Sequence, residues 1–272
     1  MKSTTIPKPA IILCADDFGL SAGVNRAILD LVGQKRLSAV SCMSLAPAWA
    51  EGAEELKLFR EQINAGLHLT LTYLPPLTKE MGDRHPPGGK FVLKSWLRLL
   101  DKNIIEKELR AQFEKFIAVW GAPPDFIDGH QHVHVLPVVR DIVLRLRNEY
   151  APKAWMRNVV DFTALDDSWK CGLLAVLGWR WLQILKKNNI PHNKFMRGAY
   201  DYHAEPVDYA VMMTAWCSAG SSALVYCHPG FPDAGLARYD SVLEPRRREY
   251  NFFNSSAFGE WLEHKITLVG QP

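Results

Sequence analysis

The sequence predicts an α/β fold in which a parallel sheet curls into an incomplete or distorted, TIM-like (β/α) barrel of about seven strands. Short apolar runs alternate with amphipathic helical stretches along most of the chain, which is typical of parallel sheets. The 272 residues, 48% of them hydrophobic, can also bury a large core, and barrels of this length commonly form one domain. We therefore expect a single domain over residues 1–272, with an open doubly wound sheet as the alternative.

The amino-terminal part of the chain shows the clearest alternation. Val24, Ile28 and Leu31 recur at helical spacing, and Ser21 is placed to cap the helix that they form. The expected elements are a strand at 10–15, this helix, a strand at 38–45, a helix at 49–59 and a strand from residue 63 onward.

A loop insertion is expected around residues 73–103. This segment is too long for a plain connection and carries the turn formers Pro75, Pro76, Pro86, Pro87, Gly88 and Gly89. It is therefore a candidate lid or binding loop. Beyond it we expect a helix at 105–120, a strand at 125–135, a helix at 138–147 and a short strand at 155–160.

The carboxy-terminal part is less regular. It is expected to form a Trp-rich helix at 173–187, a helix at 206–219, a strand at 222–227 and a final helix that ends near His264. Because we find no internal repeat and no low-complexity linker, one barrel is more economical than two domains.

Composition excludes several classes of function. The balance of 32 Lys+Arg against 29 Asp+Glu leaves a formal charge of +3 without a long basic run, which argues against a nucleic-acid partner. Five cysteines form no CxxC pair, so neither a disulfide framework nor a cysteine zinc site is indicated. With no signal-peptide pattern at the amino terminus, we expect a cytoplasmic protein with reduced thiols.

A membrane span is not expected. The most apolar long segment, residues 172–185, is interrupted by Arg180 and is shorter than the roughly 20 residues that a spanning helix needs. Trp179, Trp181, Lys186 and Lys187 leave surface contact with lipid open, although a buried core helix explains this segment equally well.

Four polar clusters lie at or just beyond expected strands, where parallel α/β folds place their active sites. Asp16 and Asp17 follow the first strand, and adjacent carboxylates on an extended backbone point in different directions. One can therefore bind a metal while the other accepts a proton. His68 lies in the third strand, and His228 ends the strand at 222–227.

Three histidines, His130, His132 and His134, recur at period two. In an extended strand all three rings project from one face. Burying them together costs desolvation unless a metal or hydrogen bonds compensate. Asp and His ligands from separate strands suit a divalent cation with open water positions, which can acidify water and polarise a carbonyl.

In these motifs the sequence resembles the YdjC-like carbohydrate deacetylases, a group that includes chitooligosaccharide deacetylase and the hopanoid-associated HpnK proteins. The matching segments are Ala15-Asp16-Asp17-Phe18-Gly19, Gly66-Leu67-His68, Asp128-Gly129-His130-Gln131-His132-Val133-His134 and Cys227-His228-Pro229-Gly230, in the family's order and approximate spacing. Together they span most of the chain.

The resemblance implies a metal-dependent hydrolase that removes the acetyl group from an N-acetylated sugar, either an oligosaccharide or a lipid-linked glycan. It implies Asp17, His68 and His130 as metal ligands, Asp16 as the general base and His228 as the acid. The implied ion is Mg²⁺ in preference to Zn²⁺. The sequence leaves open a homodimer, the roles of His132 and His134, and whether Arg157 orients substrate or forms an ion pair.

Two other functions remain as alternatives. A metal-dependent amidohydrolase or phosphoesterase is suggested by the spacing of His130 and His132, but that class often needs a second set of metal ligands. A non-catalytic, metal-supported carbohydrate-binding protein would have no use for a free Asp16. The presence of Asp16 and His228 therefore favours an enzyme.

Overall fold

The computed structural model describes residues 8–162, 169–202, 208–218 and 220–272. The strands in these residues are β1 (Ala10–Phe18), β2 (Ala39–Cys42), β3 (Asn64–Leu69), β4 (Phe126–Gly129), β5 (Trp155–Met156), β6 (Phe195–Arg197), β7 (Ala223–Cys227) and β8 (Thr267–Leu268). Their order in the sheet is β5-β4-β3-β2-β1-β7-β6, and β8 pairs with β1 beside this path. Every pairing is parallel, as the alternation in the sequence predicts.

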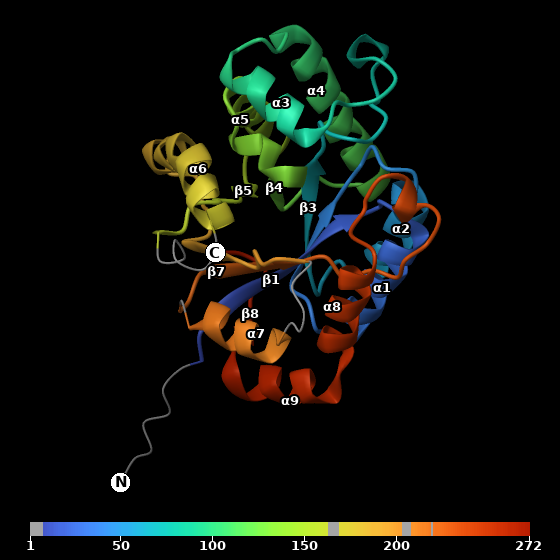
Figure 1. The fold of residues 1–272 in the computed structure, drawn as a ribbon, viewed down its shortest axis with the longest axis vertical. Helices are drawn as coiled ribbons and strands as arrows, with labels where there is room; N and C mark the ends of the chain where they lie inside the picture. The colour runs from blue at the N-terminus through green and yellow to red at the C-terminus, as the bar shows by residue number, and fades with distance from the viewer. Residues whose placement is uncertain (1–7, 163–168, 203–207, 219) are drawn as a thin grey trace.

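The sheet curls into an incomplete α/β barrel (Figure 1). Among the described residues, its outer strands β5 and β6 are joined by no ladder, and one parallel bridge connects Met156 to His192 just before β6. The predicted fold class is therefore confirmed. β6 and β8 were not expected from the sequence, because strands of three and two residues are too short to show a pattern of their own.

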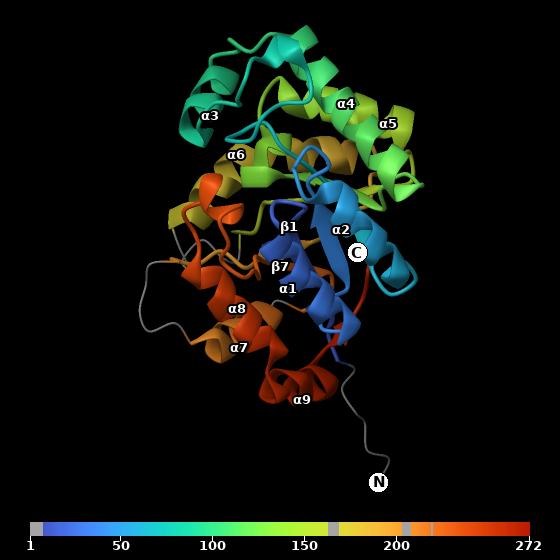
Figure 2. The same cartoon turned by 90° about the vertical axis from the view of Figure 1, so that its right-hand side faces the viewer.

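Helices surround the sheet (Figures 1 and 2). They are α1 (Ala22–Gly33), α2 (Trp49–Leu56), α3 (Gly88–Trp96), α4 (Lys102–Trp120), α5 (Val139–Tyr150), α6 (Trp169–Lys187), α7 (Tyr209–Cys217), α8 (Glu244–Asn254) and α9 (Ser256–Lys265). Ser21 caps α1 as expected, because its Oγ accepts the Val24 N–H at 3.3 Å. The expected final helix that ends near His264 is α9, which Ser255 caps; Ser255 is extended and separates this helix from α8.

The insertion at residues 73–103 is not only loop, since it contains α3. The Pro-Gly pattern here marks a helix start: Pro87 stands at the N-cap and Gly88 begins the helix. A Cβ at Gly88 would lie 2.2 Å from Oε1 of Gln131, so a larger residue here would displace the Gln131 side chain. The insertion is thereby packed against the segment that follows β4.

The core lies on both faces of the sheet. Eight of the nine residues of β1 are buried, which explains why its sequence is an apolar run rather than an alternation.

Cys14, Cys42, Cys217 and Cys227 are free, buried thiols. Among the described residues, no helix combines the length and the apolar character needed to cross a bilayer. The division into one domain stays a prediction.

Candidate active site

The two aspartates at the end of β1 are aimed by a distortion of the strand. The register of β1 against β2 shifts between Ala15 and Phe18, and Asp17 has a φ of 69°, which is rare for a residue other than glycine. Bulges of this kind re-aim side chains next to active sites. Asp16 and Asp17 are both almost completely buried, so their carboxylates must find charged or hydrogen-bonding partners inside the protein.

Asp17 lies against two histidines from other strands. Its Oδ1 is 3.3 Å from Nε2 of His68 in β3 and 3.0 Å from Nδ1 of His130, which follows β4. One carboxylate oxygen and two imidazole nitrogens therefore converge on a single point, and these atoms all lie within 4.8 Å of one another. Burial alone would raise the pKa of the Asp17 carboxyl, but Arg246 and His130 beside it hold this pKa well below its usual range.

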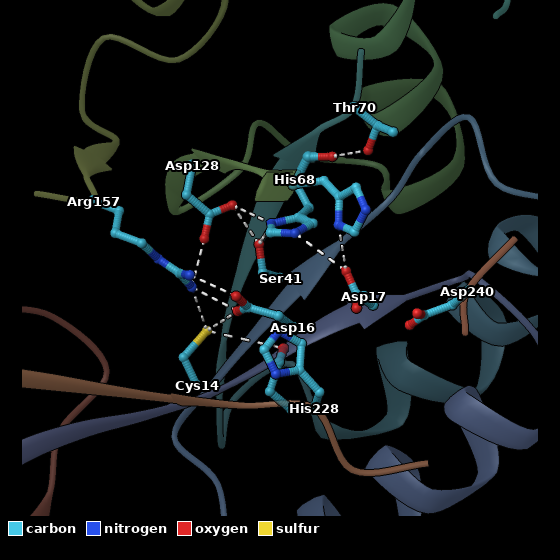
Figure 3. A network of polar contacts seen from close by, with 12 residues as sticks. Cys14, Asp16, Asp17, Ser41, His68, Thr70, Asp128, Arg157, His228 and Asp240 are labelled. Atoms are coloured by element: carbon cyan, nitrogen blue, oxygen red, sulfur yellow. Dashed lines mark hydrogen bonds and ion pairs between the residues drawn. The ribbon is translucent and has the colours of Figure 1, made fainter. Parts of the chain in front are cut away.

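The other ring nitrogen of His68, Nδ1, lies within hydrogen-bond distance of two further buried side chains (Figure 3). Its Nδ1 is 2.7 Å from Oδ1 of Asp128 and 2.8 Å from Oγ of Ser41, which itself donates to Asp128. Burial opposes protonation of His68, yet the Asp128 and Asp17 carboxylates outweigh burial and raise its pKa to about 10. A carboxylate on the far nitrogen is the arrangement that orients metal-binding histidines and fixes their tautomer.

Arg157 joins two of the buried carboxylates (Figure 3). Its Nη1 and Nη2 reach the two oxygens of Asp16 at 2.6 Å each, and Nη2 also lies 2.6 Å from Oδ2 of Asp128. The sequence left open whether Arg157 orients substrate or forms an ion pair. Arg157 is completely buried, and the structure shows it in an ion pair. Asp16, His68 and Asp128 also lie close enough to hold a metal, but the guanidinium already gives both carboxylates a positive partner.

His228 follows β7 and is anchored at two points. Its Nδ1 is 2.8 Å from the hydroxyl of Tyr202, and its backbone N–H donates to Oε2 of Glu249 in α8. Glu249 is almost fully buried and also accepts from the hydroxyl of Tyr200. The ring is thus oriented through Nδ1, and its Nε2 has no hydrogen-bond partner among the residues that the structure describes.

The expected strand at 125–135 is wrong beyond Gly129. The chain turns there into a 3-10 helix, His130–Val135, in which Gln131 and His132 have φ values of 51° and 58°. The alternation that would place three histidine rings on one face is thereby lost. His130 faces Asp17, while Nε2 of His134 lies 3.1 Å from the carbonyl oxygen of Arg157.

His132 and His134 are the remaining histidines of this turn. Burial lowers the pKa of His134 to about 4 and holds the pKa of His132 well below its usual value.

Trp181, in α6, donates from Nε1 at 3.0 Å to the Arg157 carbonyl oxygen that also contacts His134. Trp181 is completely buried, so the lipid-contact interpretation fails for this residue, whereas Trp179 is half exposed.

These groups surround a cavity of about 180 Å³. It is lined by Asp16, His68, Gly129, His130, Gln131, His132, Tyr202, Tyr226 and His228. A second hollow of about 450 Å³ is lined by Tyr73, Tyr239 and Asp240, among others, and shares His130 and Gln131 with the first. A third hollow, of about 680 Å³, lies at the other end of β3 and β4 beside Asn64 and Asp125 and is lined by none of the site residues.

Comparison with known proteins agrees with this arrangement. The family model described as YdjC-like protein matches residues 10–264, which include all four polar motifs. The chain belongs to the YdjC-like family. The chitooligosaccharide deacetylases of Yersinia pestis (strain Pestoides F) and of Yersinia pseudotuberculosis serotype O:1b (strain IP 31758) are each 37% identical to it over 145 residues, 51% of this chain and 56% of theirs. The chain therefore spans about half the length of the curated relatives it matches.

A solved structure supports the fold of this YdjC-like protein. A protein of Enterococcus faecalis V583, provisionally named a cellobiose-phosphate cleavage protein, superposes with a TM-score of 0.73 at 21% identity. The superposition covers 97% of this chain and 97% of the other chain. Because the identity is low, this likeness bears on the fold alone.

Several residues of this YdjC-like site escaped the sequence analysis. Ser41 and Asp128 lie within strands that the sequence predicts, but the pattern of residues indicated no role for either side chain. Arg246 and Glu249 come from a charged stretch of α8 that has the composition of a solvated helix face. Because they reach the site from the last part of the chain, only the folded structure reveals their contacts with Asp17 and His228.

Proposed function

We propose that this YdjC-like protein is a metal-dependent hydrolase that removes the acetyl group from an N-acetylated sugar. The observation that carries the proposal is the convergence of Asp17, His68 and His130 on one point, next to a cavity that His68 and His130 line together with Asp16 and His228. The names of the Yersinia relatives support the reaction and the substrate class.

The three converging side chains fit a divalent cation. Asp17 and the two imidazoles are a mixed oxygen and nitrogen donor set, and Asp128 holds the far nitrogen of His68. Two imidazoles suit Zn²⁺ better than Mg²⁺, which prefers oxygen ligands, so the donor chemistry argues against the preference for Mg²⁺ that the resemblance implies. A cation bound there would acidify water and polarise the acetamide carbonyl.

The protein's own side chains would move the protons. Asp16 keeps lone pairs that Arg157 does not use, because each carboxylate oxygen can accept two hydrogen bonds. It would take a proton from the attacking water, while Arg157 fixes its orientation. His228, oriented through Nδ1, would deliver a proton from Nε2 to the departing amine, which is a poor leaving group when unprotonated.

One feature of the site disfavours the two-metal alternative. The second candidate set, Asp16, His68 and Asp128, shares His68 with the first and contacts the guanidinium of Arg157 through both carboxylates. A second cation would have to displace a buried positive charge. The site therefore supports one cation, in contrast to the usual amidohydrolase or phosphoesterase centre.

The direct test is acetate release from N-acetylglucosamine oligosaccharides and from lipid-linked N-acetylated sugars, using chelator-treated protein with and without added Mg²⁺ or Zn²⁺. We expect metal to restore release, and the more effective ion identifies the cofactor. Retention of bound metal without acetate release from any member of the panel would contradict the deacetylase assignment. The cytoplasmic location, the homodimer and contact of Trp179 with lipid stay predictions.

A further inference from the structure

Arg246 lies behind the proposed metal ligand Asp17. While Oδ1 of Asp17 faces the two imidazoles, its Oδ2 accepts a hydrogen bond from Nη2 of Arg246, in α8. Nε and Nη2 of Arg246 also reach Oδ2 of Asp240, at 3.1 and 2.6 Å. Arg246 is 3% exposed and the Asp240 side chain 21% exposed. One buried positive charge is therefore shared between a carboxylate of the site and a carboxylate outside it.

We infer that Arg246 is a positioning residue that directs a single oxygen of Asp17 to the cation and weakens cation binding, and that Asp240 partly offsets this effect. The inference rests on the proposed metal site. The inference assigns roles to Arg246 and Asp240. Neither residue is needed for the proposed proton transfers by Asp16 and His228.

The direction of the effect follows from charge. An imidazole that binds a cation is neutral and adds no charge to the site. Asp17 is therefore the only anionic member of the proposed ligand set, and Arg246 cancels that charge at close range. A unit positive charge opposes a divalent ion by about tenfold in affinity even at roughly 6 Å in a water-like dielectric, and burial makes the opposition stronger. Asp240 acts in the opposite sense on Arg246, but more weakly because water reaches it.

The arrangement also restricts geometry. With Oδ2 engaged by a guanidinium, Asp17 offers one oxygen to the cation rather than two. Positions around the ion are thereby left for water and substrate, which catalytic metal sites need. Arg246 would thus trade affinity for open coordination positions.

Two substitutions with opposite expected effects test the inference. Arg246→Met removes the positive charge and should lower the dissociation constant for Zn²⁺ at least about tenfold. Asp240→Asn leaves Arg246 with Asp17 as its only anionic partner among the described contacts, and should raise the dissociation constant. Arg246→Lys keeps the charge and should stay near the unsubstituted protein. A purely structural role would weaken binding in all three variants alike.

The measurement is Zn²⁺ competition with a chromophoric chelator on the full chain, with circular dichroism to confirm folding. Asp17→Ala serves as the reference without a site. If the unsubstituted protein binds Zn²⁺ no better than Asp17→Ala, both the proposed function and this inference fail. If it binds but Arg246→Met does not bind more tightly, or Asp240→Asn does not bind less tightly, only the inference fails. Should Arg246→Met not fold, Asp240→Asn and Arg246→Lys still decide the matter.

Discussion

The two neighbouring aspartates of the site, Asp16 and Asp17, have different partners. Asp17 faces two imidazoles and one guanidinium, whereas both oxygens of Asp16 face Arg157. The bulge near the end of β1 separates their directions. The adjacent pair in the sequence suggested a division of labour, which stays a prediction, and it could not show which cations would stabilise each carboxylate in a buried position.

This division can be tested with one variant of each aspartate. Asp16→Asn should keep metal, because no proposed ligand changes, and should lose about 10²- to 10⁴-fold in kcat/KM because an amide cannot act as a base. Asp17→Ala should lose both metal and activity. Asp125→Asn, at the other end of the sheet where Asp125 accepts the Ala65 backbone N–H, is the control away from the site and should keep both. Full activity of Asp16→Asn, measured by acetate release, would refute the assignment of the base.

The turn after β4 shows how a single element can mislead sequence reasoning. Period-two histidines predict a strand face, but left-handed backbone at Gln131 and His132 turns the chain and sends the rings to different partners. His134 ends up completely buried, with the backbone carbonyl of Arg157 as partner for Nε2. It stabilises the fold in its neutral form, because burial disfavours the charged form and lowers its pKa to about 4.

Stability in mild acid should depend on His134. The unfolded chain takes up this proton below a pKa of about 6.5, whereas the folded chain does so only near pH 4, so stability falls as pH decreases between these values. At pH 4.5 the loss attributable to His134 should be on the order of 2.5 kcal/mol. Urea unfolding at pH 7 and pH 4.5 should show a smaller loss for His134→Gln than for the unsubstituted protein. Equal losses would show that His134 is not the titrating group.

At the scale of the whole molecule, the order of the strands makes much of the site predictable. Parallel strands bring their carboxyl ends to one edge, so Asp16, Asp17, His68 and His130 could be expected together from position in sequence alone. Arg246 could not, because α8 follows the last of these by more than a hundred residues and its charges resemble those of a solvent-exposed helix face. Short β6 likewise gave no signal.

The same topology predicts that a bound cation raises the thermal stability of the whole fold. Asp17, His68 and His130 come from β1, β3 and the turn after β4, so a bound cation would link separate parts of the sheet. A ligand that binds only the folded state at a hundred times its dissociation constant adds about 2.7 kcal/mol, which corresponds to a rise in Tm of roughly 5 °C or more for a chain of this size. Thermal unfolding of chelator-treated protein, followed with and without added Zn²⁺ or Mg²⁺, should show this rise. Asp17→Ala should show none, and an equal rise in that variant would place the stabilising metal at another site.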